Sequence, residues 1–307
     1  MATELRQIPA QLFTMGSDDH YPEEKPAHRV EVDAFGIETH QVTNARYAVF
    51  VADTGYRTVA ERPLDADQFP GAPPENLRAG SMVFTPTGGP VDLRHLNQWW
   101  TWTPGADWRH PEGPHSSITG REDHPVVHIA HADARAYADW AGLDLPSEAQ
   151  WEAAARGGLE HTRFSWGDEE EATGQRLANY WHGDFPWRPE PGYGATTPVG
   201  TFAPNPYGLF DMTGNVWEWT EDWYTENHAG APACCAPRNP RGGTAQASLD
   251  ARQPQFAVPR KVIKGGSFLC ADSYCRRYRP AARRPHMIDT GMSHIGFRCV
   301  TVRSADG

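Results

Sequence analysis

The chain has 307 residues, enough for one large domain or two medium ones. Its 29 glycines and 27 prolines predict many turns and much irregular chain, with 12 tryptophans to fill the interior. The formal net charge is −11 at pH 7, and nucleic acids and anionic membranes are also negatively charged, so we do not expect either as the main partner. No stretch approaches the roughly 18 apolar residues that a membrane span needs.

The first residues and the cysteine content predict the cellular location. The start, "MATELRQIPAQLF", has no basic region followed by an apolar run, so we expect no signal peptide. The chain has only 5 cysteines, and structural disulfides are uncommon in a reducing compartment. Together these features predict a cytoplasmic protein.

The N-terminal part of the chain predicts one strand and then one helix. Apolar and polar residues alternate around Val30 and Val32, which predicts a strand. The stretch "NARYAVFVADTG" predicts a helix that Thr43 or Asn44 caps and that Gly55 ends.

The middle of the chain predicts packed loops followed by two helices. Residues 71–120 are rich in Pro, Gly and Trp, and this aromatic density predicts long packed loops rather than disorder. The Ala-rich stretch "HADARAYADWAG" predicts a helix that stops at Gly142. In "LPSEAQWEAAARGG", Ser147 and Gln150 form a capping box, and the helix closes at Gly157.

The C-terminal part predicts short strands divided by turns, over residues 197–224 and 261–270. No break in composition marks a boundary between domains. We therefore predict one domain over residues 1–307.

Two cysteines stand out because Cys270 and Cys275 lie five positions apart in "SFLCADSYC". On a helix their side chains would diverge by roughly 140°, and on a strand they would point to opposite faces. Only a loop between them brings the sulfur atoms together. Converging thiolates would form either a reversible disulfide or a soft two-coordinate site for Cu(I). The alternative is two unrelated buried cysteines.

Three histidines lie close together in the sequence, as the ligands of a metal site can: His124, His128 and His131. Pro125 disfavours a helix that would place the first two on one face, and a strand would separate the last two. We therefore expect other roles for them.

The turn "DMTGNVWEW" carries Asp211, Asn215 and Glu218 around a glycine. Hard oxygen ligands at short spacing suit Ca²⁺, with backbone carbonyls completing the shell, although the stretch is not an EF-hand. An exposed acidic turn is the alternative reading.

The remaining cysteines suggest no site. Cys234 and Cys235 are adjacent, so their side chains point apart and make a poor chelate; we expect them on a mobile loop. Cys299, in "GFRCV", is predicted to be a buried strand residue that acts as a small apolar group. Motifs typical of serine hydrolases, zinc proteases, P-loop proteins and dinucleotide-binding proteins do not occur.

Several stretches together resemble the formylglycine-generating enzymes, the sulfatase-modifying factor family. The resemblance covers about residues 13–300. Its motifs, in chain order, are "MGS…EKPAHRVEVDAFGIETHQVTNARYAVF", "WRHPEGPHSSI", "DHPVVHIAHADARAYADWAG", "LPSEAQWEAAARGG", "NPYGLFDMTGNVWEWTEDWY", "KGGSFLCADSYCRRYRPAAR" and "GFRCV". "GNVWEW" and "GFR" belong to the wider superfamily, whereas "WRHPEGP" and the paired cysteines are specific to these enzymes.

The resemblance implies an α+β fold: a single compact domain, poor in regular structure and related to C-type lectin folds. It also implies a copper-dependent oxidase that uses O₂ to convert the cysteine of a C-x-P-x-R segment in an unfolded sulfatase to Cα-formylglycine. A monomer is expected.

The resemblance assigns roles to five residues. Cys270 and Cys275 match the two copper-binding, catalytic cysteines. Ser267 matches the serine near the oxygen pocket, Trp217 the tryptophan beside it, and Tyr274 the tyrosine between the cysteines. A substrate thiolate would join the two thiolates on Cu(I), and the protein would supply soft ligation, orientation and a closed pocket.

The resemblance also implies two structural calcium sites. Asp211 and Glu218, with the carbonyls of Gly214 and Val216, match the first. A second, less complete set matches Asn179, Tyr180 and Tyr193, with Glu190 as the candidate carboxylate.

Two rival functions use the same fold. A non-catalytic, lectin-like binding module would bind its ligand without Cys270 and Cys275. An iron sulfoxide synthase would need an H-x₃-H-x-E motif, but Ile129 and Ala130 follow His128 instead.

Overall fold

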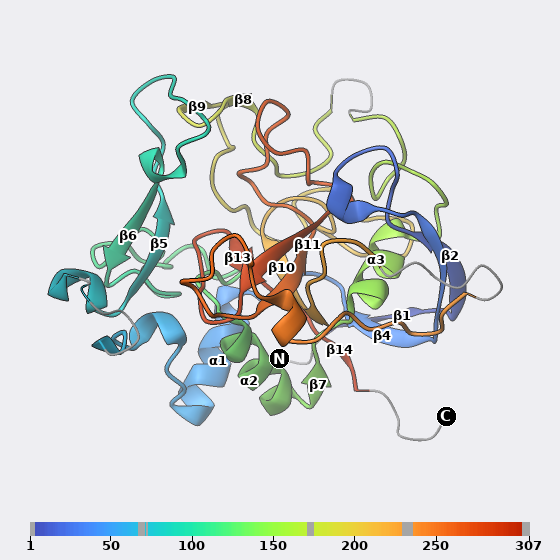
Figure 1. The fold of residues 1–307 in the computed structure, drawn as a ribbon, viewed down its shortest axis with the longest axis horizontal. Helices are drawn as coiled ribbons and strands as arrows, with labels where there is room; N and C mark the ends of the chain where they lie inside the picture. Colours follow the sequence, from blue (N-terminus) through green and yellow to red (C-terminus); the bar gives the residue numbers. More distant parts are fainter. Residues whose placement is uncertain (1–3, 67–70, 72, 171–174, 229–235, 303–307) are drawn as a thin grey trace.

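The computed structural model describes residues 4–66, 71, 73–170, 175–228 and 236–302. Its centre is a four-stranded sheet in the order β12-β11-β10-β13, in which only the β10–β13 pair is parallel (Figure 1). The strands are β10 (Trp217–Trp223), β11 (Arg260–Lys264), β12 (Arg283–Met287) and β13 (Ile295–Gly296).

A second sheet joins the two ends of the chain. Its antiparallel order is β1-β4-β14-β7, so the N-terminal and C-terminal strands share one hydrogen-bonded layer. The strands are β1 (Leu5–Ile8), β4 (Phe35–Glu38), β7 (Leu143–Asp144) and β14 (Val300–Thr301). Ile8 is buried, so the packed structure begins before Phe13, where the resemblance began.

Three two-stranded ribbons surround these sheets. They are β2 (Gln11–Met15) with β3 (His28–Val32), β5 (Gly80–Phe84) with β6 (Trp100–Pro104), and β8 (Gly183–Asp184) with β9 (Arg188–Pro189). The strand predicted around Val30 is confirmed. Residues 71–120 were predicted to be loops only, and that was wrong because β5 and β6 pair within them. The pairing joins positions about 20 residues apart, which a local pattern does not show.

The three predicted helices are confirmed with their caps. They are α1 (Asn44–Thr54), α2 (His131–Ala141) and α3 (Glu148–Arg156). Thr43 accepts from the Arg46 amide, the Ser147–Gln150 capping box forms, and Gly55, Gly142 and Gly157 end the helices with positive φ.

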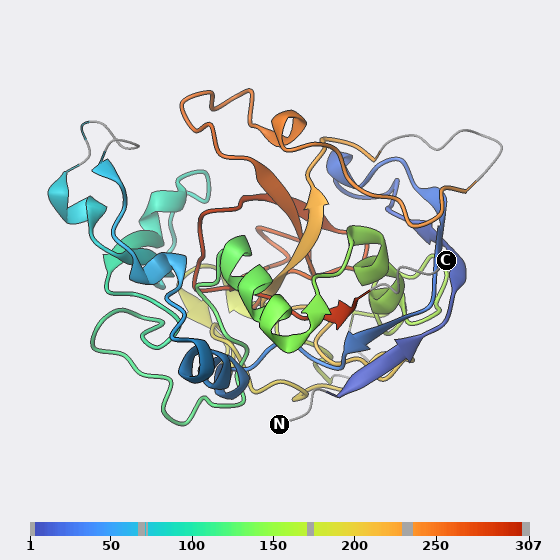
Figure 2. The same ribbon diagram turned by 90° about the horizontal axis from the view of Figure 1, so that it is seen from below.

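Helix α3 packs against β10 and β11, and short 3₁₀ turns connect other segments. Seen from below, α2 lies in the foreground with α3 beside it (Figure 2). None of the helices in the described ranges is long and apolar enough to cross a membrane. The 3₁₀ turns are Pro22–Glu24, Val59–Glu61, Pro74–Leu77, Leu96–Gln98 and Gln246–Ser248.

Buried charges attach α3 to the central sheet. The Glu152 carboxylate accepts from Lys264 Nζ on β11 at 3.0 Å and from Arg156 Nη2 at 2.7 Å. Glu148 accepts from Arg283 Nε on β12 at 2.7 Å. Burial alone would raise the pKa of Glu152, but Lys264 and Arg156 outweigh it and hold the pKa at about 2.

We expect this cluster to make the protein acid-sensitive. The pKa of Glu152 in the folded protein lies below its value of about 4.5 in the unfolded chain. Its contribution to the free energy of unfolding is therefore present above pH 4.5 and is lost as the pH falls toward about 2. Urea unfolding at pH 6 and pH 3 should show a smaller loss of stability for Glu152→Gln than for the wild type. An equal loss in both proteins would contradict this assignment, and Glu160→Gln, in an exposed pair with Arg29, is the control.

Candidate active site

The loop after β11 brings the two cysteines together. Gly265 and Gly266 have φ of +92° and +74°, which only glycine adopts without strain. A side chain at Gly266 would also collide with the backbone of Tyr278. The Cys275 amide then donates to the Ala271 carbonyl at 2.7 Å, which closes a helical turn between the cysteines.

Cys270 and Cys275 face each other, with their Sγ atoms 3.5 Å apart. Both side chains are buried, and both are free thiols. The separation is far longer than the roughly 2.05 Å of a disulfide bond. The prediction that a loop brings the sulfurs together is confirmed.

The two sulfur atoms differ in their affinity for a proton. The pKa of Cys275 falls to about 5, first because Cys270 donates a hydrogen bond to its sulfur and then because Arg277 and Arg284 lie near it. Burial raises the pKa of Cys270 far above its usual range. Ionisation of the pair is therefore favoured at Cys275 over Cys270.

Arg277 was not among the predicted site residues, and the structure places it beside Cys275. Its Nη1 lies 3.8 Å from Cys275 Sγ. Its Nη2 donates to Glu23 at 2.6 Å, and its guanidinium lies 3.7 Å from the ring centre of Tyr21. The basic run directly after Cys275 was the available sequence signal, but its contact with an N-terminal segment was not visible.

Arg284, on β12, is a second positive charge near the cysteines. It faces Ile263 across the sheet and lowers the pKa of both thiols. Within the part of the chain that the structure describes, no ion pair joins it to a carboxylate.

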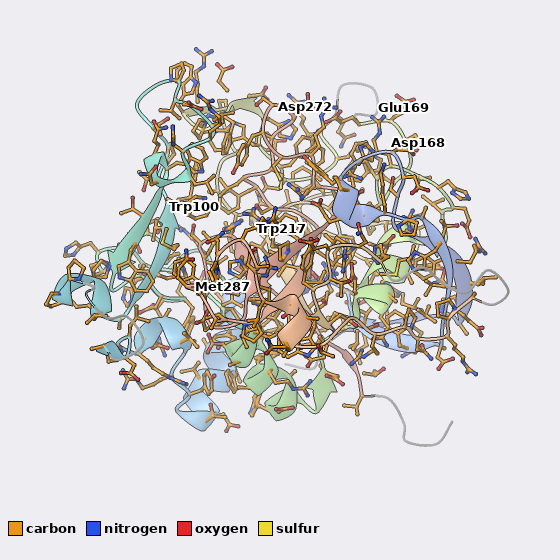
Figure 3. The ribbon with its side chains drawn as sticks, viewed as in Figure 1. Trp100, Asp168, Glu169, Trp217, Asp272 and Met287 are labelled. Carbon is orange, nitrogen blue, oxygen red and sulfur yellow. The ribbon has the colours of Figure 1, made fainter. Side chains whose placement is uncertain are left out.

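Ser267 and Trp217 lie around the cysteine pair. Ser267 is fully buried, and its carbonyl accepts from the Cys270 amide at 2.9 Å. Its hydroxyl accepts from the Leu269 amide at 3.2 Å. Trp217, on β10, lies at the centre of the molecule (Figure 3) and packs in the hydrophobic cluster that contains both cysteines.

Tyr274 lies in an aromatic cluster beside the thiols. Its ring stacks on Phe185, with ring centres 4.6 Å apart, and meets Trp99 edge-on at 5.7 Å. Burial raises the pKa of Tyr274, so its hydroxyl stays protonated at neutral pH. The structure thus places Ser267 and Tyr274 next to the cysteine pair and Trp217 in the same hydrophobic cluster, while the roles that the resemblance assigned to them stay predictions.

At the first predicted calcium site, the carboxylate of Glu218 is surrounded by donors. Arg298 donates to both of its oxygens at 2.7 and 2.8 Å, Trp151 Nε1 at 2.7 Å and Gln41 Nε2 at 2.9 Å. These four bonds use the lone-pair positions of a carboxylate. In this arrangement Glu218 has no oxygen left for a cation.

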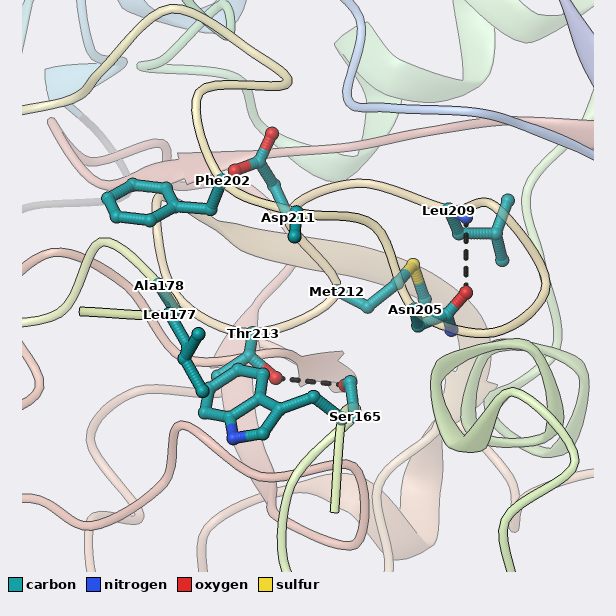
Figure 4. A pocket seen from close by; sticks show the side chains of 11 residues that line it. Ser165, Leu177, Ala178, Phe202, Asn205, Leu209, Asp211, Met212 and Thr213 are labelled. Atoms are coloured by element: carbon teal, nitrogen blue, oxygen red, sulfur yellow. Dashed lines mark hydrogen bonds between the residues drawn. The ribbon is translucent and has the colours of Figure 1, made fainter. Parts of the chain in front are cut away.

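Asp211, from the same turn, is buried and has fewer partners. Its Oδ2 accepts from the Gly200 amide at 2.7 Å, and burial raises its pKa to about 6. It borders a small cavity beside Phe202 and Met212 (Figure 4). Gly214 has a φ of +80°, and its amide donates to the Gly265 carbonyl. The carbonyls of Gly214 and Val216 are the remaining members of the predicted calcium set. Calcium here stays a prediction.

The second predicted calcium set is only partly consistent with a cation. Asn179 is buried, and its Oδ1 has no hydrogen-bond partner, as expected of an oxygen ligand. Glu190, however, accepts two hydrogen bonds from Arg176, so its carboxylate serves a guanidinium. Tyr180 and Tyr193 both pack against the ring of His182. This site also stays a prediction.

The three histidines make hydrogen bonds to different partners and do not share one site. His124 contacts Thr196, and His131 contacts Glu221 at 3.1 Å. His128 lies between Ser81 and the Pro111 carbonyl. Across the described ranges, no group of three or more His, Cys, Asp or Glu side chains is arranged to hold a metal ion.

Of the other cysteines, Cys299 lies within the described residues. Cys299 is fully buried directly before β14, and its amide donates to Glu38 at 2.7 Å. This agrees with the prediction of a small buried residue at a strand. Cys234 and Cys235, for which we predicted a mobile loop, lie outside the described residues.

Comparison with known proteins defines the class. Residues 2–303 match the family described as "Sulfatase-modifying factor enzyme 1-like domain", and the chain belongs to this family. It is 52% identical to the formylglycine-generating enzyme of Mycobacterium tuberculosis over 305 residues, which cover 98% of both chains. It is 44% identical to that of Thermomonospora curvata, over 95% of this chain and 91% of the relative.

A solved structure has the same fold. PvdO from Pseudomonas aeruginosa superimposes with a TM-score of 0.61 over 97% of this chain and 94% of its own, at 24% identity. The predicted fold class is confirmed: a single compact domain with few helices and several small sheets.

Proposed function

We propose that this protein is a formylglycine-generating enzyme. It oxidises the cysteine of a C-x-P-x-R segment in an unfolded sulfatase to Cα-formylglycine. Two electrons and two protons leave the substrate cysteine for O₂, and water then replaces the sulfur, which leaves as H₂S. The observation that carries the proposal is the pair of converging, buried free thiols, 3.5 Å apart, in a chain 52% identical to a formylglycine-generating enzyme.

The cysteine pair fits the copper ion that the family resemblance implies. Soft thiolate sulfur is the donor that Cu(I) prefers, and Cys270 and Cys275 offer two such atoms facing one space. Arg277 and Arg284 offset the negative charge that two thiolates would carry. When bound, Cu(I) would supply the one-electron chemistry that O₂ requires.

The surrounding residues would position the substrate and exclude water. Tyr274 lies beside the thiol pair, Trp217 packs in the same hydrophobic cluster, and Ser267 anchors the turn from which Cys270 projects. We assign orientation of the substrate cysteine and exclusion of stray oxidation to this pocket.

Calcium at the Asp211 turn is a structural proposal. Asp211 is buried with a single hydrogen-bond donor, whereas Glu218 of the same set already accepts four hydrogen bonds, so Asp211 and the backbone carbonyls would hold the ion. We further propose a cytoplasmic monomer, a location supported by the free thiols of the three described cysteines.

The non-catalytic, lectin-like module is the weaker reading. A binding module has no use for two thiols held in contact inside the protein, where burial penalises a charged sulfur. Catalysis at a soft metal does use them.

The direct test is turnover of a synthetic peptide. We expect the Cu(I)-loaded protein in air to convert a C-x-P-x-R peptide to an aldehyde, detected with a hydrazide probe, and to release H₂S. A peptide with serine in place of the cysteine is the control and should give neither product. Absence of aldehyde from the loaded protein at saturating peptide would contradict the proposal.

A further inference from the structure

A second cavity, of about 290 Å³, lies where the β2–β3 ribbon packs against α3 (Figure 1). Its lining includes Met15 from β2, His28 from β3 and Ala149 from α3. His228, which follows β10, lines it as well. No cysteine is among the described residues around it, so this cavity is separate from the pair formed by Cys270 and Cys275.

Two histidine rings lie against each other at this cavity. The ring centres of His28 and His228 are 5.0 Å apart, and the ring planes are inclined by 49°. When two imidazoles bind one ion through nitrogen atoms at about 2 Å, their ring centres lie no more than about 6 Å apart. The observed spacing is therefore within the range of two rings that share a metal ion.

His28 has one ring nitrogen available as a ligand. Its Nδ1 donates to the Pro26 carbonyl at 2.8 Å. A neutral imidazole carries a single N–H, so the lone pair is on Nε2. Histidines that bind metals are usually oriented in this way, with the second nitrogen donating to a carbonyl or a carboxylate.

His228 has a buried nitrogen for which the surrounding chain supplies no partner. The side chain is 9% exposed, and Nε2 has no hydrogen-bond partner within the described ranges. The residue is held by its amide, which donates to the Lys25 carbonyl at 2.9 Å. Gly16 leaves room for the ring, because a Cβ there would lie 3.2 Å from His228 Cδ2. A buried polar atom in this state calls for an ion or a water molecule as its partner.

Met15 supplies a third donor atom. It lies directly opposite His28 in the β2–β3 register, and its side chain is buried. Side chains of directly opposed residues in antiparallel strands project from the same face, with Cβ atoms about 5 Å apart. The thioether sulfur of methionine is a soft ligand.

The carboxylates of the cavity are already engaged. The two oxygens of Glu148 accept from Arg283 at 2.7 and 2.9 Å. Those of Asp222 accept from the backbone amides of Glu148 and Gly242. The donors that remain are imidazole nitrogen and thioether sulfur, which favour Cu(I) over the hard ions Ca²⁺ and Mg²⁺.

We propose that His28, His228 and Met15 form a Cu(I) site separate from the cysteine pair, with two imidazole nitrogens and one thioether sulfur as ligands. The described ranges hold no metal-binding cluster of three or more His, Cys, Asp or Glu side chains, and here the third ligand is a methionine. This inference goes beyond the proposed function, because the site binds its ion whether or not the chain oxidises a sulfatase.

The test is a Cu(I) titration without oxygen, in competition with the coloured chelator bicinchoninate. The other thiols would compete for Cu(I), so the titration uses a four-serine protein that carries Cys234→Ser, Cys235→Ser, Cys270→Ser and Cys275→Ser. We expect this protein to bind one equivalent of Cu(I).

Substitutions in the four-serine protein assign the ligands. His28→Ala and His228→Ala should each weaken Cu(I) binding by at least about 100-fold, because the loss of an outer partner of a ligand alone costs about 10- to 100-fold. Met15→Leu nearly conserves side-chain volume, so it should keep the fold while it removes the sulfur. The exposed His95 is the control, and His95→Ala should leave the affinity unchanged.

Two further measurements identify the ligands and check the fold. X-ray absorption of the bound Cu(I) should show a sulfur neighbour that Met15→Leu removes. Circular dichroism and the thermal midpoint establish that each variant is folded, so that a loss of Cu(I) is a loss of ligands.

The possible outcomes divide clearly. Absence of Cu(I) from the four-serine protein overturns the proposal, and so does Cu(I) that stays bound after both histidine substitutions. Tighter binding of Zn²⁺ than of Cu(I), unaffected by Met15→Leu, overturns the assignment of a soft ion. Peptide oxidation is not measured, so failure of the proposed oxidase activity leaves these outcomes unchanged, and loss of this site leaves the proposed activity standing.

Discussion

Replacing either Cys270 or Cys275 by serine abolishes aldehyde formation from a C-x-P-x-R peptide. Each substitution removes one of two sulfur atoms that lie 3.5 Å apart, and a hydroxyl oxygen is a poor donor for a soft metal ion. We expect kcat/KM to fall by about a thousandfold or more, as when an essential catalytic group is lost. Peptide turnover under air with Cu(I) measures this.

The fold should survive both substitutions, because serine is close to cysteine in size. Circular dichroism and the thermal midpoint check that survival. Cys299→Ala is the matched control: it removes another buried thiol, which lies next to Glu38 and is not part of the pair, and should keep the activity. Turnover by Cys270→Ser near the wild-type rate would show that the chemistry does not use the pair.

Replacing Arg298 by methionine destabilises the protein by about 3–5 kcal/mol, the cost of leaving a buried charge uncompensated. Both Arg298 and Glu218 are fully buried, and the guanidinium donates to both carboxylate oxygens. It also donates to the carbonyl of Phe210 at 2.9 Å, so the substitution leaves several acceptors without donors. Urea unfolding at neutral pH measures the loss.

Two further variants separate charge from packing. Glu218→Gln combined with Arg298→Met should recover part of the stability, because the stranded charge is gone. Arg94→Met removes an exposed partner of Asp92 and should cost less than about 1 kcal/mol. Equal losses for Arg298→Met and Arg94→Met would contradict the argument.

The Glu218–Arg298 pair matters for the site as well as for stability. Glu218 follows Trp217 on β10, and the next strand positions pair with β11, from which the cysteine loop emerges. A disturbed pair would therefore move both Trp217 and the thiols, so activity should fall together with stability in Arg298→Met.

Much of the local structure was predictable because its causes lie within a few residues. The cap of α1 is a bond between Thr43 and the Arg46 amide, and Gly142 ends α2 through its own positive φ. The β5–β6 ribbon was missed because the partners of Gly80 and Phe84 lie at Pro104 and Trp100, beyond any local window.

The candidate site was predictable to a different extent. Five residues, from Trp217 to Cys275, were assigned through the family resemblance, and the geometric reasoning on the cysteines had already required a loop. Arg277 was missed because its role depends on Glu23, 254 positions away in the chain.

The sequence by itself determined the helices, the need for a loop between two thiols, and the family. These depend on residue type and spacing along the chain. Only the tertiary structure decided that the two sulfur atoms lie 3.5 Å apart and that Arg277 contacts both Cys275 and Glu23. Charge effects fall off with distance through space, and folding sets that distance between residues that are hundreds of positions apart.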